Sequence, residues 1–361
     1  MMMSKITTPS KPSLLLVGNH CALNEALYRR YVCADYVVTW LHPEARGGSI
    51  GHFLGDLKAT LDQERPTQMI VSPAPVMPRA ERLSKPALVL QAHLLAPAQT
   101  IELAFNAGVP RLLFVGSHDI YPGGATLPNA EEDVRLPRDI TLGSELATGH
   151  LACIQMCAAY SEQRGAQDID YRSVVMSDVF GPGEVQEQGT GKVVHALIDR
   201  MHRARLQGFD RVVIQGDGSQ RRDWLFAADA AEAAMQTQCL TRDSYRQHTL
   251  PGLRHLGAGS GGCLSLMELA GAIARTVGYE GHVVTQHSGV TPGPDQQVDD
   301  TRLRRSGWRP RVSLEAALRQ TYEGYLKSKL AGESGTAHHS QRVVAKRVFG
   351  LAGGAQYAVE Q

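Results

Sequence analysis

Arg111-Leu-Leu-Phe-Val-Gly-Ser-His-Asp-Ile-Tyr-Pro-Gly-Gly124 is the stretch that decides the fold. Residues 112–115 are a continuous apolar run, which is typical of a strand buried on both faces of a parallel sheet. Ser117, His118 and Asp119 follow directly, so a hydroxyl, an imidazole and a carboxylate lie just past the carboxyl end of this strand. In open α/β sheets ligands bind at that edge. The stretch therefore indicates a ligand site, and an ordinary polar loop after a strand is the alternative.

The rest of the chain alternates apolar runs with helical patterns. Further strands are expected at residues 13–18, 36–40, 69–72 and 173–176, and helices at 19–31, 88–108 and 144–164. Pro97 should kink the second of these helices. Strands that alternate with helices predict right-handed βαβ units. The expected fold class is α/β, a Rossmann-like doubly wound parallel sheet with a smaller C-terminal α/β substrate-binding lobe.

The domain organisation follows from a change of pattern after Gly181-Pro-Gly183. We expect a leader at 1–12, a dinucleotide-binding type of domain at 13–178 plus about 222–260, and a substrate-binding lobe at about 179–221 plus 261–330. That lobe should hold helices at 192–205, 264–277 and 314–330, and a strand at 211–214. Residues 331–361 read as a flexible tail, because Gly, Ser and His precede a short basic stretch.

Composition excludes several classes of function. The 361 residues carry a net charge of +1 from 37 basic and 36 acidic side chains, so nucleic acid and anionic membranes are not expected partners. Six cysteines show no metal-binding spacing, and we expect no metal. Cys153 and Cys157, four residues apart, should be small buried residues. Without a signal peptide or a long apolar run, the chain is expected to be cytoplasmic.

Several short motifs, in order, resemble those of the extended short-chain dehydrogenases that act on nucleotide sugars. This is the NAD-dependent epimerase/dehydratase family, and the resemblance is greatest to its GDP-L-fucose synthases. The motifs lie at residues 112–122, 179–182, 216–225, 256–259, 277–284 and 300–308. Those enzymes epimerise C3 and C5 of GDP-4-keto-6-deoxymannose and then reduce C4 with NADPH. The resemblance implies a GDP-sugar as the small-molecule ligand and NADP as the cofactor, if any.

The family also pairs the helix at 144–164 with its symmetry mate, so the resemblance implies a homodimer. An isologous interface of this kind needs an apolar stripe. Four residues could supply it: Leu146, Leu151, Ile154 and Ala158.

The first loop departs from the family pattern G-x-x-G-x-x-G. Gly18 keeps the first position, but Cys21 and Asn24 stand at the second and third. The second glycine lets the backbone approach the pyrophosphate, and the third lets the helix pack close to the strand. Cofactor binding by Gly18, Cys21 and Asn24 is therefore expected to be obstructed. Arg46 could meet a 2′-phosphate, or it could be a solvated loop arginine.

The hydride-transfer residues depart as well. The family's Tyr-x-x-x-Lys falls on Leu146 and His150. Leucine has no proton to give, and a histidine with an ordinary pKa of about 6.5 is mostly neutral at pH 7. By resemblance, His150 remains a candidate catalytic and ribose-binding residue. Ser117 matches the serine that hydrogen-bonds the keto oxygen.

The epimerisation pair and the substrate arginines complete the candidate site. The family's cysteine and histidine fall on Asp119 and Lys192. These two could move protons if the pKa of the aspartate were raised and that of the lysine lowered, or they could form a plain ion pair. Arg222, in Arg-Arg-Asp-Trp, matches the arginine that grips the diphosphate, and Arg200 matches a second substrate arginine. A basic pair of the family is replaced by Asp295-Gln296.

Three functions remain open from the sequence. The chain could perform the family's epimerisation and reduction with a rearranged site. It could be a hydride-incompetent GDP-sugar binder, acting as a silent or regulatory partner of an active paralogue. It could also epimerise without reduction. In each case the role lies in GDP-6-deoxyhexose biosynthesis.

Overall fold

A computed structural model describes residues 11–43, 50–72, 79–121, 127–134, 144–163, 168–184, 193–286 and 294–333. Its main sheet has six parallel strands in the order β10-β5-β4-β3-β1-β2. They are β1 (Ser13–Val17), β2 (Val37–Leu41), β3 (Gln68–Val71), β4 (Arg111–Ser117), β5 (Asp170–Met176) and β10 (Leu256–Ala258). The expected Rossmann-like parallel sheet is confirmed, and the strand order reverses at β1, where ligands bind in such sheets.

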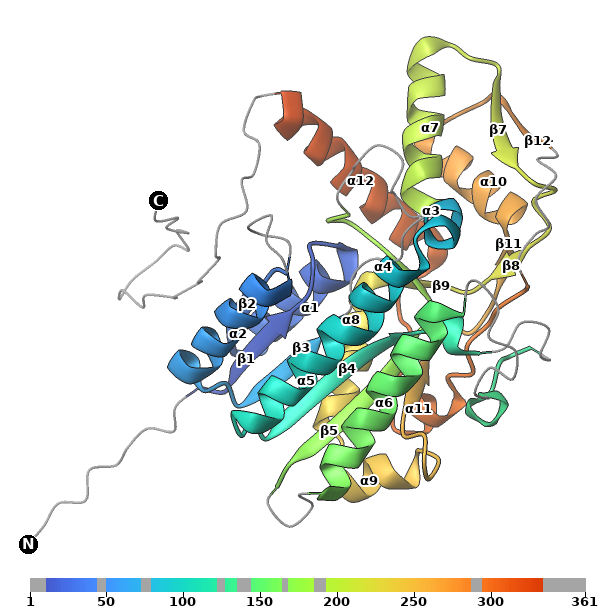
Figure 1. The fold of residues 1–361 in the computed structure, drawn as a ribbon. Coiled ribbons are helices and arrows are strands. Elements are labelled where there is room, and N and C mark those ends of the chain that lie inside the picture. The colour runs from blue at the N-terminus through green and yellow to red at the C-terminus, as the bar shows by residue number, and fades with distance from the viewer. Residues whose placement is uncertain are drawn as a thin grey trace, which may run out of the picture.

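Two layers of helices cover the sheet (Figure 1). On one face, α1 (Ala22–Cys33) and α8 (Ala227–Cys239) bury Leu27, Tyr31 and the alanines of α8. On the other face, α2 (Ile50–Glu64), α5 (Ala96–Asn106) and α6 (Glu145–Gln163) bury their apolar sides. The central strands bury side chains on both faces, which is why β4 reads as a continuous apolar run.

The helix predicted at 88–108 is interrupted, as expected from Pro97, in the turn just before that residue. It consists of α4 (Pro86–Leu90), a wide π turn η1 (Gln91–Leu95) and α5, with the Ala96 N–H bonded to the Gln91 carbonyl. Pro97 follows in the first turn of α5; it has no N–H, and its ring crowds the carbonyl four residues earlier, that of His93 in the π turn. Pro86–Asn106 is also the one described helix long and apolar enough to cross a membrane, and part of it packs inside the protein.

A second lobe has its own core (Figure 1). It contains α7 (Val193–Gln207), β7 (Arg211–Gln215), α10 (Leu266–Val277), β12 (His282–Gln286) and α12 (Leu314–Glu333). Helix α10 was expected to begin at residue 264, but it begins two residues later because Ser265 and Glu268 form a capping box. The short pairs β6 (Asp178–Phe180) with β9 (Trp224–Phe226) and β8 (Arg221–Arg222) with β11 (Leu264–Ser265) also belong to the described structure.

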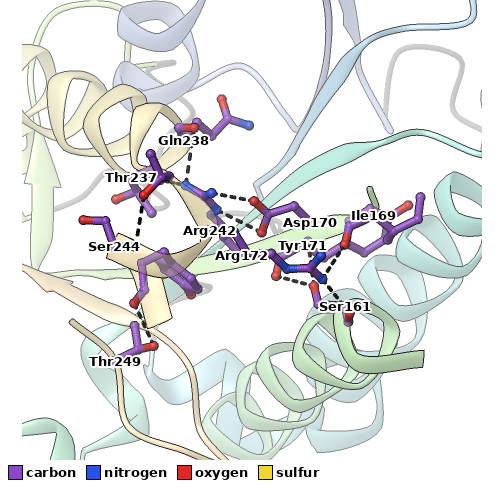
Figure 2. Close-up of polar contacts among 12 residues, drawn as sticks. Ser161, Ile169, Asp170, Tyr171, Arg172, Thr237, Gln238, Arg242, Ser244 and Thr249 are labelled. Atoms are coloured by element: carbon purple, nitrogen blue, oxygen red, sulfur yellow. Dashed lines mark hydrogen bonds and ion pairs between the residues drawn. The ribbon is translucent and has the colours of Figure 1, made fainter. Parts of the chain in front are cut away.

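Five short helices complete the described elements: α3 (Arg79–Ser84), η2 (His118–Ile120), η3 (Glu131–Asp133), α9 (Arg242–Gln247) and α11 (Thr301–Arg305). Helix α9 packs near β5, where two arginines connect separate segments of the chain (Figure 2). The buried Arg172 guanidinium donates to both oxygens of Asp170, at 3.1 and 2.5 Å, and to the Thr237 carbonyl at 2.6 Å. Arg242 donates to two further carbonyls, those of Ser161 and Ile169.

The apolar stripe expected to form a dimer interface is not on the surface. Leu146, Leu151 and Ile154 are at most 3% exposed, because α6 packs these side chains inside the protein. Only Ala158 of the four is partly accessible. Cys153 and Cys157 are buried, as predicted.

Candidate functional site

Ser117 and Asp119 form a closed hydrogen-bonded pair at the carboxyl end of β4. The Ser117 hydroxyl donates to Asp119 Oδ2 at 2.6 Å, and its oxygen accepts the Asp119 N–H at 3.3 Å. Ser117 thereby caps the short helix η2. Its hydroxyl proton points at a carboxylate of the chain, so this proton is already engaged.

Positive and polar neighbours keep Asp119 ionised. Burial raises the pKa of its carboxyl, but His118, the Ser117 hydroxyl, Arg82 and Arg222 together hold that pKa below the usual value. The proton-transfer role considered for this residue required a raised pKa. Asp119 is thus a poor base for removing a proton next to a ketone.

His150 is buried and uses both ring nitrogens. Its Nδ1 accepts the Ser117 backbone N–H at 2.9 Å, and its Nε2 lies 3.2 Å from Nδ1 of His93 on the π turn. Burial, and then the neighbouring His93, lower the pKa of His150 to about 3. Burial likewise lowers the pKa of His93 to about 4. Both rings are therefore neutral at pH 7.

Leu146 lies one turn before His150 on α6 and is 1% exposed. It provides neither a proton nor a hydrogen bond.

Arg222 lies at the same edge of the sheet, on β8. Its Nη1 donates to Asp178 Oδ2 at 3.1 Å, and both side chains are 30% exposed. Its partner Asp178 lies just after β5, the neighbour of β4, and Arg222 contributes to the lowered pKa of Asp119. Asp178 was not singled out from the sequence, and no local pattern marks it.

The other candidates on the second lobe are placed differently. Arg200 is exposed on α7 and donates to the Val213 carbonyl at 2.6 Å. Lys192 and Arg46 lie outside the described residues, so the ion pair between Asp119 and Lys192 stays a prediction. Asp295 accepts the Arg221 N–H, and Gln296 donates its N–H to the Arg221 carbonyl.

The loop after β1 is filled by its own side chains. The Asn24 amide donates to the Asn19 carbonyl at 2.7 Å, and a Cβ on Gly18 would lie 2.4 Å from that amide nitrogen. Gly18 therefore tolerates no side chain. Cys21 precedes the first residue of α1 and is buried.

A carboxylate from a distant segment lies at the N-terminus of α1. Glu184, which is 162 residues further along the chain, accepts the Ala22 backbone N–H at 3.1 Å. Gly183, the residue before Glu184, has a φ of +92° and lies close to the Glu25 side chain. A negative group is favourable at this position because the first N–H groups of a helix are unpaired and the helix dipole is positive there.

Aromatic rings occupy the end of β2. The Trp40 indole donates to the Gly18 carbonyl at 2.9 Å. It stacks on His42, His20 and Tyr28, with ring centroids 4.5, 5.4 and 5.9 Å away. These rings lie beside the first loop, at the strand end next to the point where the sheet order reverses.

Comparison with known proteins assigns the family. The profile described as "NAD dependent epimerase/dehydratase family" matches residues 54–238. The GDP-L-fucose synthase of Escherichia coli K12 is 32% identical over 266 residues, covering 74% of this chain and 82% of that protein. The chain belongs to the NAD dependent epimerase/dehydratase family.

Two further proteins extend the comparison. GDP-L-fucose synthase 1 of Arabidopsis thaliana is 31% identical, over 76% of this chain and 81% of its own. The GDP-mannoheptose C4 reductase of Campylobacter jejuni, solved with NADP bound, has a TM-score of 0.73 at 21% identity, over 89% of this chain and all of that chain. The family profile begins at residue 54, so its match does not include the first loop.

The residues of this chain do not fit a dinucleotide as the family pattern would. A pyrophosphate at the start of α1 would need the N–H groups where Glu184 is bound, and it would face that carboxylate. Asn24 fills the loop, and Trp40 with its stacked rings occupies the neighbouring strand end. Within the described ranges, no group of three or more His, Cys, Asp or Glu residues is arranged to hold a metal ion.

Proposed function

We propose that this protein acts in GDP-sugar biosynthesis as a member that binds a GDP-6-deoxyhexose but does not carry out conventional hydride transfer. The sugar nucleotide is suggested by the relatives, since GDP-L-fucose synthases match about three quarters of the chain. The site supports it with Arg222 at the carboxyl edge of the sheet, where a guanidinium can bind a diphosphate through two hydrogen bonds.

One observation carries the second half of the proposal. The positions that match the family's tyrosine and lysine hold a buried leucine, Leu146, and a neutral histidine, His150, whose two nitrogens are both engaged. Neither can deliver a proton to a sugar oxygen. Loss of a general acid costs about 10²- to 10⁴-fold in rate. The filled cofactor loop adds a second obstacle.

An assay with GDP-4-keto-6-deoxymannose and NADPH tests this proposal directly. We expect no oxidation of NADPH above background at high protein concentration, while the GDP-sugar binds in equilibrium dialysis. Turnover that Ser117→Ala abolishes would refute the absence of hydride transfer. Failure of any GDP-sugar to bind would refute the ligand.

Epimerisation without reduction is the alternative that needs no dinucleotide. Asp119 supports it by placing a carboxylate beside Ser117, but the lowered pKa of that carboxylate weakens it as a base. Solvent deuterium entering C3 or C5 of the keto sugar, and lost in Asp119→Asn, would establish this activity. Unchanged exchange in that variant would remove Asp119 from it.

A further inference from the structure

The hydrogen bonds of His150 and His93 fix where their protons are. The Ser117 N–H is a donor, so His150 Nδ1 must be the unprotonated acceptor. A neutral His150 then carries its proton on Nε2 and donates it to Nδ1 of His93. His93 in turn accepts on Nδ1 and must carry its own proton on Nε2. The pair is a relay of two neutral imidazoles with one allowed arrangement of protons.

The relay ends in a donor without an acceptor. His93 is 0% exposed, and its Nε2 has no hydrogen-bond partner in the described part of the chain. Leaving a buried donor unpaired costs about 1–3 kcal/mol. Such a group in a folded protein calls for a partner, and the described residues do not supply one.

The π turn η1 places His93 in close contact with α6. His93 lies in the middle of this turn, and single π turns within helices often occur at functional sites. Gly149 allows the two helices to approach, since a Cβ there would lie 2.6 Å from the His93 carbonyl oxygen. Phe114 packs edge-on against the His150 ring at 5.7 Å and holds the pair from the strand side. His93 is thus held on η1 by contacts with α6, and β4 supports it through His150.

His93 is connected to the candidate site through His150, which accepts the Ser117 N–H. Burial lowers the pKa of His93, while the charge of Asp119 raises that pKa and the charge of Arg82 lowers it. The Ser117 hydroxyl proton is bound by Asp119 and is not available to a ligand. His93 Nε2–H, one hydrogen bond behind His150, is a neutral donor with no partner among the described residues.

We propose that His93 Nε2–H donates a hydrogen bond to an uncharged oxygen, a hydroxyl or a keto group, on the sugar of the bound nucleotide. A neutral imidazole suits such an oxygen because it can polarise a carbonyl without carrying a charge. His150 is a positioning residue, since its Nε2–H holds His93 in the tautomer that exposes the donor. This proposal rests on the proposed function.

Nuclear magnetic resonance of the wild-type protein labelled with ¹⁵N histidine tests the proton arrangement without any substitution. We expect both His93 and His150 to be neutral with the proton on Nε2 at pH 7. Addition of GDP-L-fucose should shift the His93 Nε2–H signal. A proton on Nδ1 of either ring would overturn the relay, and a His93 signal unmoved at saturation would overturn the ligand contact.

Two substitutions and a matched control test the contact by affinity. His93→Phe removes both nitrogens and should weaken GDP-L-fucose binding about 3- to 10-fold, the value of one hydrogen bond. His93→Gln keeps an acceptor for His150 and a donor for the ligand, so it should restore most of that affinity. His255→Phe, at another fully buried histidine that contacts Tyr121, should leave affinity within about 2-fold.

The outcomes separate the two proposals. GDP-L-fucose binding that is equal in His93→Phe and the wild type would overturn the role of His93 and leave the proposed function standing. No binding by the wild-type protein would overturn the proposed function itself. Circular dichroism of each variant checks the fold. If His93→Phe does not fold, the resonance experiment on the wild-type protein is the test of the ligand contact.

Discussion

Substitutions at Asp178 and at Arg222 should change the affinity for a GDP-sugar in opposite directions. Arg222 Nη1 is bound to Asp178 Oδ2 at 3.1 Å, so a diphosphate must displace this carboxylate before the guanidinium can bind it. Asp178→Asn should therefore tighten binding, and Arg222→Ala should weaken it. The backbone of β6 is unaffected, because the Asp178 N–H bonds to the Asp223 carbonyl whatever the side chain.

The size of each effect follows from the exposure of the pair. Both side chains are 30% exposed, so the ion pair contributes only about 0.2–1 kcal/mol. Releasing Arg222 should raise affinity by up to about 5-fold, and removal of the negative charge should add to it. Loss of charged hydrogen bonds to the diphosphate costs about 1.5–3 kcal/mol, so Arg222→Ala should weaken binding about 10- to 150-fold.

Isothermal titration with GDP-L-fucose measures both changes. Arg203→Ala, which breaks the ion pair with Asp199 on α7, is the matched control and should leave the affinity unchanged. The tightening in Asp178→Asn should shrink as salt is raised, because charges that are partly exposed are screened. Equal affinity in the wild type and both variants would refute the placement of the diphosphate at Arg222.

Three further predictions concern the cofactor loop, the core and pH. The double variant Asn24→Gly, Glu184→Gln should gain NADPH binding, seen as quenching of tryptophan fluorescence, because it clears the loop and the start of α1; no gain would show that these side chains are not the obstacle. Arg172→Met should lower the free energy of unfolding by about 3–5 kcal/mol in urea, since it leaves Asp170 and buried carbonyls unpaired, and a loss below about 1 kcal/mol would contradict this. The folded-state pKa values of His93 and His150, about 4 and 3, lie below the unfolded value, so the unfolded chain binds more protons below pH 6.5. The free energy of unfolding should therefore fall as pH drops from about 6.5 to 4, by up to about 3 kcal/mol for each histidine, and His93→Gln should flatten this slope.

The elements of the fold were readable from the sequence where a local pattern determines them. The apolar runs of β1 and β4 predict buried parallel strands, and both form. Helix α2 was not predicted. Pro97 predicted a kink in the helix at 88–108, and the irregular turn lies just before it, but the sequence does not show that the kink takes the form of a π turn.

The sequence predicted only those parts of the candidate site whose residues lie in recognisable motifs. Ser117 and Asp119 are neighbours in sequence, so their pairing follows from one strand end. The contact of His93 with His150 joins residues 57 apart, and that of Glu184 with Ala22 joins residues 162 apart. No spacing rule predicts such pairs, since they depend on how α6 meets η1 and on where the segment after β6 returns. These contacts decide what the site can do.

The central claim is that this fold holds a GDP-sugar without a working dinucleotide site. Side-by-side calorimetric titration of the purified protein with GDP-L-fucose and with NADPH tests it most directly. We predict heat of binding for GDP-L-fucose and none for NADPH, because Glu184 is bound at the first N–H group of α1 and Asn24 fills the loop after β1. Tight binding of NADPH, or no binding of GDP-L-fucose, would contradict the account.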